Sequence, residues 1–370
     1  MMWDWQQKEW PEFSYDASQL KKQEEAFLLE AGKLLGAFSH FNKSDKIELT
    51  IELITDEAMK SSEIEGQMLN RDSLQSSIRR HFGLATDKQR IPPAEQGMAE
   101  MMLDLYHHFD QPLSHETMFQ WHDQLMMGRR DLHDVGCYRS GEEPMQVVSG
   151  YINNPKVHFE APPSSSLADE MARFVNWFND TGSDGSRPLP ALTRAGLAHH
   201  YFVTIHPFED GNGRIGRALS EKVLAQSLKQ PTLIALSHVI EKHKKDYYAQ
   251  LNSHNHTLHV TSWINYFADT IFDAICYSQT LICFLINKTK LFDRVRGQLN
   301  ARQEKVLNRM FKQGLEGFKG GLSAENYVSI TQTSRATATR DLQKLLELAA
   351  LTRTGTLKST RYWLNLEDKY

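Results

Sequence analysis

The sequence predicts a mainly α-helical protein with one short β-hairpin and a small basic domain at its C-terminal end. Apolar residues recur at intervals of three and four over most of residues 16–290, which is the pattern of amphipathic helices. Residues 146–160 differ, because apolar and polar side chains alternate there on both sides of an Asn-Asn-Pro turn. Residues 291–370 carry 14 Lys and Arg against 8 Asp and Glu, whereas the rest of the chain carries 28 against 38. The last segment therefore forms a separate basic domain.

The composition is that of a globular protein made in a reducing compartment. The 370 residues, of which 40% are hydrophobic, suffice for two or three domains with their own cores. No basic stretch leading into an apolar run opens the chain, so no secretory signal is expected. The most apolar segment, Ile271–Ile286, is too short for a membrane span and contains Asp273. No Cys-x-x-Cys pair occurs, so we expect a cytoplasmic location, no membrane partner and three buried thiols, at Cys137, Cys276 and Cys283.

The first predicted domain, residues 1–90, begins with an aromatic arm and continues with two helices. We expect the arm to lie across the protein body or a neighbouring subunit, because exposing so many aromatic rings to water is unfavourable. Its aromatic residues are Trp3, Trp5, Trp10, Phe13 and Tyr15. The predicted helices are residues 16–41 and 45–66. In the second helix Ser61 and Glu65 lie four residues apart on one face, and Gly66 is a natural stop.

The second predicted domain, residues 91–290, contains further helices around the hairpin. In chain order the predicted helices are residues 94–109, 115–127, 164–179, 192–205, a segment that includes Ile215 and Leu219, 238–252 and 260–290. The predicted strands of the hairpin are residues 146–150 and 156–159. The helix at 192–205 ends before Pro207, because proline disfavours helical structure in the residue before it.

The densest set of reactive side chains lies between two of these helices, in residues 206–217. Gly211 and Gly213 allow a tight turn and bring backbone N–H groups close to a ligand at the start of the next helix. Unpaired N–H groups and the helix dipole favour an anion there, such as a nucleotide phosphate. Arg214 and Arg217 leave the first turn of that helix toward the same side, and their planar guanidinium groups suit the outer phosphates.

Two further residues complete a predicted site for phosphate chemistry. Asp210 offers a carboxylate oxygen to Mg²⁺, which binds a few carboxylates together with phosphate oxygens. His206 has an unperturbed pKa of about 6.5 and is mostly neutral near pH 7, so it suits the role of a general base. The alternative interpretation is a polar loop between two helices.

Residues 206–217 match the motif of the Fic family, His-x-Phe-x-(Asp/Glu)-Gly-Asn-Gly-Arg-x-x-Arg, at every specified position. The chain therefore resembles the Fic protein adenylyltransferases over about residues 16–290. The resemblance implies a Fic-type helical bundle, ATP as co-substrate and Mg²⁺ as cofactor. It also implies transfer of AMP to a Tyr, Thr or Ser hydroxyl of a target protein, with pyrophosphate leaving.

The resemblance assigns a role to each matching residue. The roles are general base for His206, core packing for Phe208, Mg²⁺ binding for Asp210, α-phosphate binding for Gly211, Asn212 and Gly213, and outer-phosphate binding for Arg214 and Arg217. Kinase-type relatives carry Lys where Gly213 stands, so phosphorylation is disfavoured. UTP or CDP-choline as the donor stays open, since nothing in the motif reads the base.

Residues 61–66 resemble the inhibitory motif of the family, (Ser/Thr)-x-x-x-Glu-(Gly/Asn), which precedes the catalytic motif in one class. The resemblance implies that Arg217 pairs either with the γ-phosphate or with the Glu65 carboxylate. While Glu65 holds the arginine, ATP cannot take its productive position. Breaking such a buried pair costs on the order of a few kcal/mol, enough to suppress turnover more than about a hundredfold. In some relatives this glutamate also helps to hydrolyse the AMP bond, so a reverse activity stays open.

The resemblance also assigns roles to the hairpin and to one later helix. In Fic proteins the hairpin, called the flap, holds a target segment by strand addition. The expected contacts here are Val148 and Gly150, and the alternative is a surface hairpin without function. The helix at 238–252 supplies Tyr248 and Asn252 as candidates for contacting adenine or ribose, although packing explains them equally well.

The basic segment, residues 291–370, is typical of a winged helix-turn-helix. Predicted helices at 301–312, 323–328 and 334–346 precede a strand pair around Gly355. The last helix and the wing carry side chains that suit phosphate contacts and some reading of base edges. The candidates for DNA binding are Arg335, Thr337, Arg340, Lys344 and Arg361. The alternative is a module for dimerisation or target docking.

Two classes of function therefore compete. The first is a cytoplasmic protein adenylyltransferase that uses ATP and Mg²⁺, is autoinhibited by Glu65 and is expected to form a homodimer. The second is a DNA-binding transcriptional regulator whose Fic core senses nucleotides. The intact motif favours the enzyme, and the sequence does not name the target protein.

Overall fold

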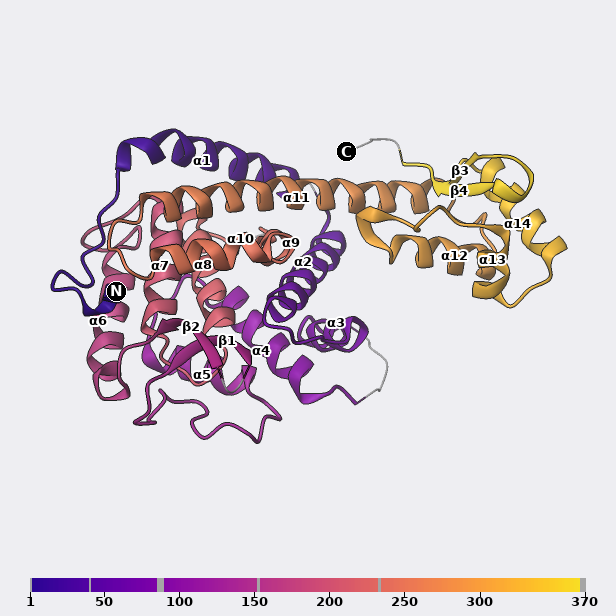
Figure 1. Ribbon diagram of the computed structural model, residues 1–370. Helices are drawn as coiled ribbons and strands as arrows, with labels where there is room; N and C mark the ends of the chain where they lie inside the picture. Colours follow the sequence, from indigo (N-terminus) through magenta and orange to yellow (C-terminus); the bar gives the residue numbers. More distant parts are fainter. Residues whose placement is uncertain (1, 40, 85–89, 152–153, 232–233, 367–370) are drawn as a thin grey trace. The chain divides into compact units, whose positions relative to one another are not determined.

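The computed structural model describes residues 2–39, 41–84, 90–151, 154–231 and 234–366 (Figure 1). The chain divides into two compact units, Met1–Ser278 and Gln279–Tyr370, and the division lies inside α11. The first unit is mainly helical with a two-stranded hairpin, and the second has helices followed by another hairpin, so the predicted fold class is confirmed. The helices up to the division are α1 (Ala17–Ser39), α2 (Lys43–Ile64), α3 (Arg71–His81), α4 (Pro93–His107), α5 (His115–Leu125), α6 (Leu167–Asp180), α7 (Ala191–Ile205), α8 (Asn212–Leu228), α9 (Leu236–Lys242), α10 (Lys244–His254) and α11 (Thr261–Arg294).

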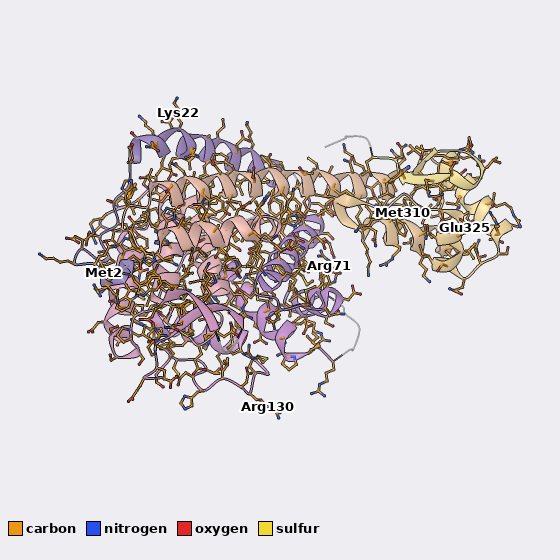
Figure 2. The ribbon with its side chains drawn as sticks, in the orientation of Figure 1. Met2, Lys22, Arg71, Arg130, Met310 and Glu325 are labelled. Atoms are coloured by element: carbon orange, nitrogen blue, oxygen red, sulfur yellow. The ribbon has the colours of Figure 1, made fainter. Side chains whose placement is uncertain are left out.

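Helices α7 and α8 form the centre of the first unit. Every residue of α7 except Val203 is buried, as expected for a helix that is largely apolar on all sides. Helix α8 packs directly against α7 and also contacts α2, α4 and α5. Side chains fill the space between these helices, as Figure 2 shows. The predicted arrangement of helix, tight loop and helix around residues 206–217 is therefore confirmed.

Helix α2 brings residues 61–66 to this central pair. It begins after Asn42, whose side chain accepts a hydrogen bond from the Asp45 N–H and so caps the first turn. Its buried face packs against α3, α4, α8 and α9. The helix ends at its C-cap Glu65, and Gly66 then adopts a φ of 80°, which glycine reaches without steric cost.

The hairpin consists of strands β1 (Gln146–Tyr151) and β2 (Asn154–Glu160), which pair antiparallel as predicted. Val147 lies opposite Phe159 and Val148 opposite Val157, so the register shifts by one residue between the two valines. Such an irregularity bends the strand and increases its twist. Part of the expected turn, Asn153, lies outside the described residues.

The second unit contains α12 (Ala301–Phe311), α13 (Ala324–Thr331), α14 (Arg335–Glu347), β3 (Leu351–Thr354) and β4 (Arg361–Leu364), in the predicted order. The buried Asp341 on α14 joins its helices. The Asp341 carboxylate accepts hydrogen bonds from Arg302 Nε at 2.8 Å and from the Tyr327 hydroxyl at 3.0 Å. Ser323 and Ser334 cap α13 and α14 through their side chains.

Two expectations about composition need correction. All three cysteines are exposed, although scattered cysteines predicted buried thiols. In addition, α11 is long and apolar enough to cross a membrane by length and composition, although no candidate span was expected from the sequence. Its apolar residues in the first unit serve a core instead, since Trp263, Phe267 and Ile271 are completely buried there.

Candidate active site

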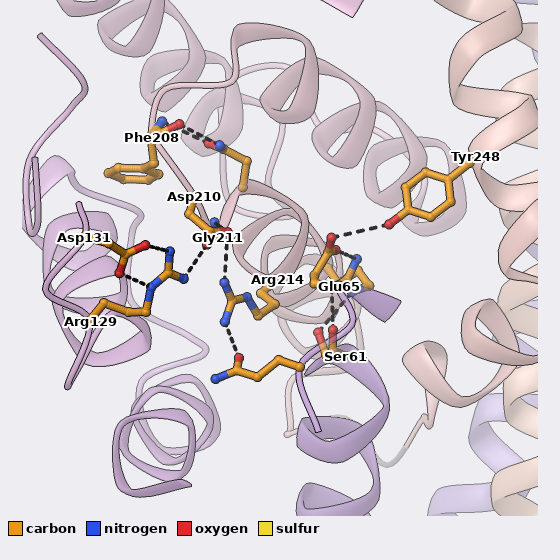
Figure 3. Close-up of polar contacts among 12 residues, drawn as sticks. Ser61, Glu65, Arg129, Asp131, Phe208, Asp210, Gly211, Arg214 and Tyr248 are labelled. Atoms are coloured by element: carbon orange, nitrogen blue, oxygen red, sulfur yellow. Dashed lines mark hydrogen bonds and ion pairs between the residues drawn. The ribbon is translucent and has the colours of Figure 1, made fainter. Parts of the chain in front are cut away.

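The loop between α7 and α8 is held in shape by its own side chains. Asn212 Oδ1 accepts a hydrogen bond from the Phe208 N–H at 3.0 Å, and Asn212 Nδ2 donates to the Phe208 carbonyl at 2.8 Å (Figure 3). Phe208 is buried and stacks on the His122 ring, with centroids 4.2 Å apart. Both polar atoms of the Asn212 side chain are therefore engaged within the loop. Asn212 therefore fixes the loop, and its expected contact with a phosphate stays a prediction.

His206 lies at the C-terminal end of α7 with its imidazole in the wall of a cavity. Its φ of 50° and ψ of 57° belong to the left-handed region, which is strained for a residue other than glycine and turns the chain sharply. His206 Nδ1 lies 3.2 Å from the Val203 carbonyl, which only accepts, so the proton of the neutral ring is on Nδ1. Nε2 then carries the free lone pair. Burial lowers the pKa of His206 to about 4, against the opposing effect of the Val203 carbonyl.

The cavity beside His206 has a volume of about 460 Å³. It is bounded by α2, the hairpin, the loop after α7 and α10, and several sequence-predicted residues meet in its wall. Its lining includes Glu65, Val147, Val148, His158, Phe159, His206, Gly213, Tyr248, Asn252 and Asn255. The backbone of Gly150, the other expected flap residue, pairs with Pro155 in the hairpin. A cavity of this size suits a drug-sized or nucleotide-sized ligand.

The Glu65 carboxylate lies at the N-terminal end of α8. Glu65 Oε1 lies 2.8 Å from Arg217 Nη1, and Arg217 is completely buried. Ser61 holds the same guanidinium group, because Arg217 Nε donates to Ser61 Oγ at 3.0 Å and Arg217 Nη2 to the Ser61 carbonyl at 2.8 Å. A Cβ atom at Gly213 would lie only 2.2 Å from Glu65 Oε1, so a side chain there would displace the carboxylate. The predicted pairing of Glu65 and Arg217 is present.

Two contacts around this pair were not expected from the sequence. The Tyr248 hydroxyl lies 3.3 Å from Glu65 Oε2 and 3.3 Å from the Ile64 carbonyl, so Tyr248 contacts the C-terminal end of α2 as well as lining the cavity. Arg214 Nη1 donates to Gln67 Oε1 at 2.7 Å (Figure 3). Arg214 and Arg217, which we expected at the outer phosphates, are therefore both bound by residues at the C-terminal end of α2 or just after it.

Asp210 is held between two arginines. Arg129 Nη1 lies 2.7 Å from Asp210 Oδ2, and Arg214 Nη2 lies 3.1 Å from Oδ1. Burial would raise the pKa of Asp210, but the hydrogen bond from Arg129 and the charge of Arg214 lower it below its usual value. The carboxylate is therefore ionised, half-exposed and able to bind a cation. Asp131 supports the arrangement by accepting hydrogen bonds from Arg129 Nε and Nη2, both at 2.7 Å.

The donor set fits Mg²⁺ with a nucleotide, because Mg²⁺ is bound by one or two carboxylates together with phosphate oxygens and water. Asp210 supplies the carboxylate. Arg129 and Arg214 each hold one oxygen of this carboxylate, so a cation bound there would compete with a guanidinium group. The contact with Arg129 had no signal in the sequence.

The candidates for DNA binding lie in the second unit, on α14 and β4. Arg335, Arg340 and Lys344 are exposed, whereas Thr337 is half-buried and its N–H is bound by Ser334 Oγ. Arg335 Nη2 lies 3.3 Å from a Glu325 carboxylate oxygen, an exposed pair of little energetic weight. Arg361 lies at the start of β4, half-buried.

Comparison with known proteins agrees with this geometry. Residues 112–224 match the model of the Fic/DOC family, and residues 3–84 match the model of a domain of unknown function, DUF4172. The loop at residues 206–217 lies inside the stretch that matches the Fic/DOC family, and part of the chain is similar to the protein adenylyltransferases called Fic.

The related sequences cover part of the chain. Protein adenylyltransferase Fic of Drosophila mojavensis is 36% identical over 114 residues, which are 30% of this chain and 20% of that protein. Protein adenylyltransferase fic-1 of Caenorhabditis briggsae is 30% identical over 133 residues, 36% of this chain and 24% of that protein. Protein adenylyltransferase Fic of Nematostella vectensis is 30% identical over 187 residues, 50% of this chain and 38% of that protein. The chain thus spans well under half the length of these relatives.

Solved structures confirm the fold. A Fic family protein from Desulfovibrio desulfuricans superposes with a TM-score of 0.52 at 19% identity, covering 94% of this chain and 97% of that one. Fic-1 from C. elegans, residues 134–508, superposes with a TM-score of 0.50 at 21% identity, covering 71% of this chain and 73% of that one. At such identities the likeness concerns the fold alone.

Proposed function

We propose that this protein is an autoinhibited protein adenylyltransferase, which transfers AMP from ATP to a hydroxyl group of a target protein. The observation that carries the proposal is the position of Glu65. Its carboxylate lies at the N-terminal end of α8, against Gly213 and paired with Arg217 at 2.8 Å, in the wall of the cavity that also contains His206. A carboxylate at this position takes the place that suits a phosphate, because both are anions that a helix N-terminus and an arginine attract.

The chemical step uses residues in the cavity wall. Nε2 of the neutral His206 accepts the proton of a target hydroxyl, whose oxygen then forms a bond to the α-phosphorus. The bond between that phosphorus and the bridging oxygen of pyrophosphate breaks, and pyrophosphate leaves with the electron pair. His206 later releases the proton to solvent. Mg²⁺ bound at Asp210 would neutralise phosphate charge, and Arg217, once free of Glu65, would pair with an outer phosphate.

Labelling of proteins with radioactive ATP tests this function. The Glu65→Gly variant, incubated with labelled ATP and Mg²⁺ in a cell extract, should transfer label to protein at least about a hundredfold faster than wild type, because the competitor for Arg217 is gone. The Glu65→Gly/His206→Ala variant is the control and should be inactive. Labelling by Glu65→Gly at the wild-type rate would refute the autoinhibition.

The reverse reaction, removal of AMP from the target protein, can be tested on the protein that Glu65→Gly has labelled. Glu65 lies in the cavity with His206, so a carboxylate is available to orient water toward a bound AMP ester. Protein labelled by Glu65→Gly and then purified should lose AMP faster with wild type than with Glu65→Gly. Equal rates would restrict the protein to the forward reaction.

DNA binding by the second unit is a second candidate function. The exposed face of α14 carries Arg335, Arg340 and Lys344, and this helix follows α13 as a recognition helix does. Affinity for random duplex DNA should fall steeply with salt, because each neutralised phosphate releases a counterion. A flat salt response would count against DNA as the partner.

A further inference from the structure

The N-terminal arm contacts the hairpin strand that faces the cavity. Trp5 Nε1 donates a hydrogen bond to the Glu160 carbonyl, the last residue of β2, at 2.7 Å. Trp3 packs edge-on against Phe159, with ring centroids 5.4 Å apart, and stacks on His256 at 4.5 Å. The two tryptophans thus contact the C-terminal end of β2.

Between the two tryptophans, Asp4 joins two other walls of the cavity. The Asp4 N–H donates to the Asn255 carbonyl at 2.9 Å, and Asp4 Oδ2 accepts from Thr204 Oγ1 at 3.3 Å. Asn255 Nδ2 in turn donates to the His158 carbonyl in β2 at 3.1 Å. Asp4 is completely buried, so these are contacts of an ordered segment.

Three of the residues that the arm touches, Phe159, Thr204 and Asn255, line the 460 Å³ cavity, and Asn255 in turn binds His158, which also lines it. Two others, Glu160 and His256, directly neighbour the lining residues Phe159 and Asn255 in the chain. On the other side of the cavity, within the described part of the chain, Ser61 and Tyr248 hold the pair of Glu65 and Arg217, and the arm does not. The arm therefore forms an outer layer behind the hairpin side only.

We propose that Trp3, Asp4 and Trp5 are positioning residues, which fix β2 and the neighbouring wall of the cavity for the acceptor segment of the target protein. The inference rests on the proposed adenylyltransferase function. A two-stranded hairpin is only marginally stable alone, so its orientation depends on what anchors it. Val147, Val148 and Val157 are exposed, so apolar burial at these positions does little to hold the hairpin. The anchor at Glu160 and Phe159 supplies the missing constraint.

The arm offers a matched pair of variants. Trp5→Phe keeps an aromatic ring and removes the N–H that binds the Glu160 carbonyl. Trp10→Phe makes the same change in the same arm, but Trp10 Nε1 donates to Glu170 Oε2 at 2.9 Å and its ring packs on Tyr201, and neither residue belongs to the hairpin. Trp10 is also the more buried of the two, so a mere loss of stability would be greater for Trp10→Phe.

The kinetic test compares both variants in the Glu65→Gly background, with extract proteins as acceptors and labelled ATP as donor. Trp5→Phe should raise the extract concentration for half-maximal labelling about fivefold, as expected for one lost hydrogen bond. It should leave the ATP concentration for half-maximal labelling unchanged. Trp10→Phe should change neither. Equal behaviour of the two variants, or an equal rise in both concentrations for Trp5→Phe, would overturn the proposal.

Hydrogen exchange decides the same question without activity. Amides of residues 154–160 should exchange faster in Trp5→Phe than in Trp10→Phe if the indole anchors β2, and equal exchange would overturn the anchoring. Should Glu65→Gly alone fail to label protein, the proposed function fails, and this measurement still decides the role of the arm.

Discussion

For single residues, the most specific prediction concerns His206 and follows from the burial of its imidazole. Burial lowers the pKa of His206 to about 4, so the ring stays neutral and able to accept a proton far below pH 6.5. Activity that needs the neutral ring is therefore lost only as pH falls through about 4. For Glu65→Gly, kcat/KM should drop less than about twofold between pH 7.5 and 5.5, whereas an unperturbed imidazole would be about 90% protonated at pH 5.5.

A second titrating group near this wall needs a control. Burial raises the pKa of Asp4 to about 7, against hydrogen bonds from Trp5 and Thr204 that lower it. The Glu65→Gly/Asp4→Asn variant cannot titrate at Asp4, so its profile isolates the imidazole. A tenfold loss of kcat/KM centred near pH 6.5 in that variant would show that His206 has an ordinary pKa.

Arg129 is predicted to compete with Mg²⁺ for Asp210. Removing the guanidinium group in Arg129→Gln frees an oxygen of Asp210, so Mg²⁺ should bind more tightly. The half-exposed ion pair is worth about 1 kcal/mol or less. The Mg²⁺ concentration for half-maximal activity in the Glu65→Gly background should therefore fall roughly threefold.

Arg130→Gln is the matched control for this effect. Arg130 is the exposed neighbour, and its side chain lies at the outer edge of the unit (Figure 2). It should leave the Mg²⁺ requirement unchanged. An unchanged or higher requirement in Arg129→Gln would mean that Arg129 assists the bound nucleotide instead of opposing the ion.

For single residues, the sequence predicted contacts between residues that stand in family motifs and missed contacts with residues outside them. The pairing of Glu65 with Arg217 was predicted because each of the two residues stands in such a motif. Arg129 and Gln67 carry no such mark, and their contacts depend on how distant segments meet. The motif also does not reveal that Asn212 fixes the loop through two hydrogen bonds with the Phe208 backbone.

Besides the pair of Glu65 and Arg217, helices α2 and α8 meet at a second pair of side chains, which is more buried. Glu57 and Glu221 are both buried, and the Glu57 carboxylate accepts the Ser237 N–H at 2.8 Å. Burial, followed by the negative charge of Glu57, raises the pKa of Glu221 well above its ordinary value. Two such carboxyl groups are best accommodated when one carries a proton that the pair shares.

This pair predicts how stability depends on pH. The pKa of Glu221 is higher in the folded than in the unfolded protein, so its contribution is complete below the unfolded pKa and is lost as pH rises through the folded one. Glu221→Gln keeps a donor and cannot ionise. Between pH 6 and 9 the melting temperature of wild type should therefore fall by a few degrees more than that of Glu221→Gln.

Glu25→Gln makes the same change of charge on the exposed surface of α1 and is the control for net charge. It should follow the wild-type melting curve at each pH. If Glu221→Gln also follows wild type, the pair is not protonated near neutral pH and α2 is held by other contacts.

The elements that the sequence predicted are those with a long apolar pattern. Helix α7 is buried on all sides and was predicted within a residue at each end. Helix α3 was missed, because within it only Leu74, Ser77 and Ile78 are buried and its other residues are polar. One helix was predicted over 238–252, whereas α9 and α10 are separate and break at His243, where neither Gly nor Pro marks the end.

At the scale of the whole molecule, the catalytic and basic parts are separate in the chain. Every residue that lines the cavity precedes Ser278, in the first compact unit. The family models also match within that unit, over residues 3–84 and 112–224. The proposed enzyme and the proposed DNA-binding surface should therefore be separable by substitution.

Reversing the charge of two exposed residues on α14 should separate them. Arg340→Glu/Lys344→Glu removes two expected phosphate contacts, so affinity for duplex DNA should fall and the salt slope should become shallower by about 2. Labelling by Glu65→Gly should stay within about twofold when this pair is added, because neither residue is in the cavity wall. Lys305→Glu/Arg309→Glu, on exposed positions of α12, makes the same change of net charge and should retain most of the affinity. Equal loss of affinity in both double variants would mean that DNA responds to the overall charge of the unit and that α14 does not recognise it.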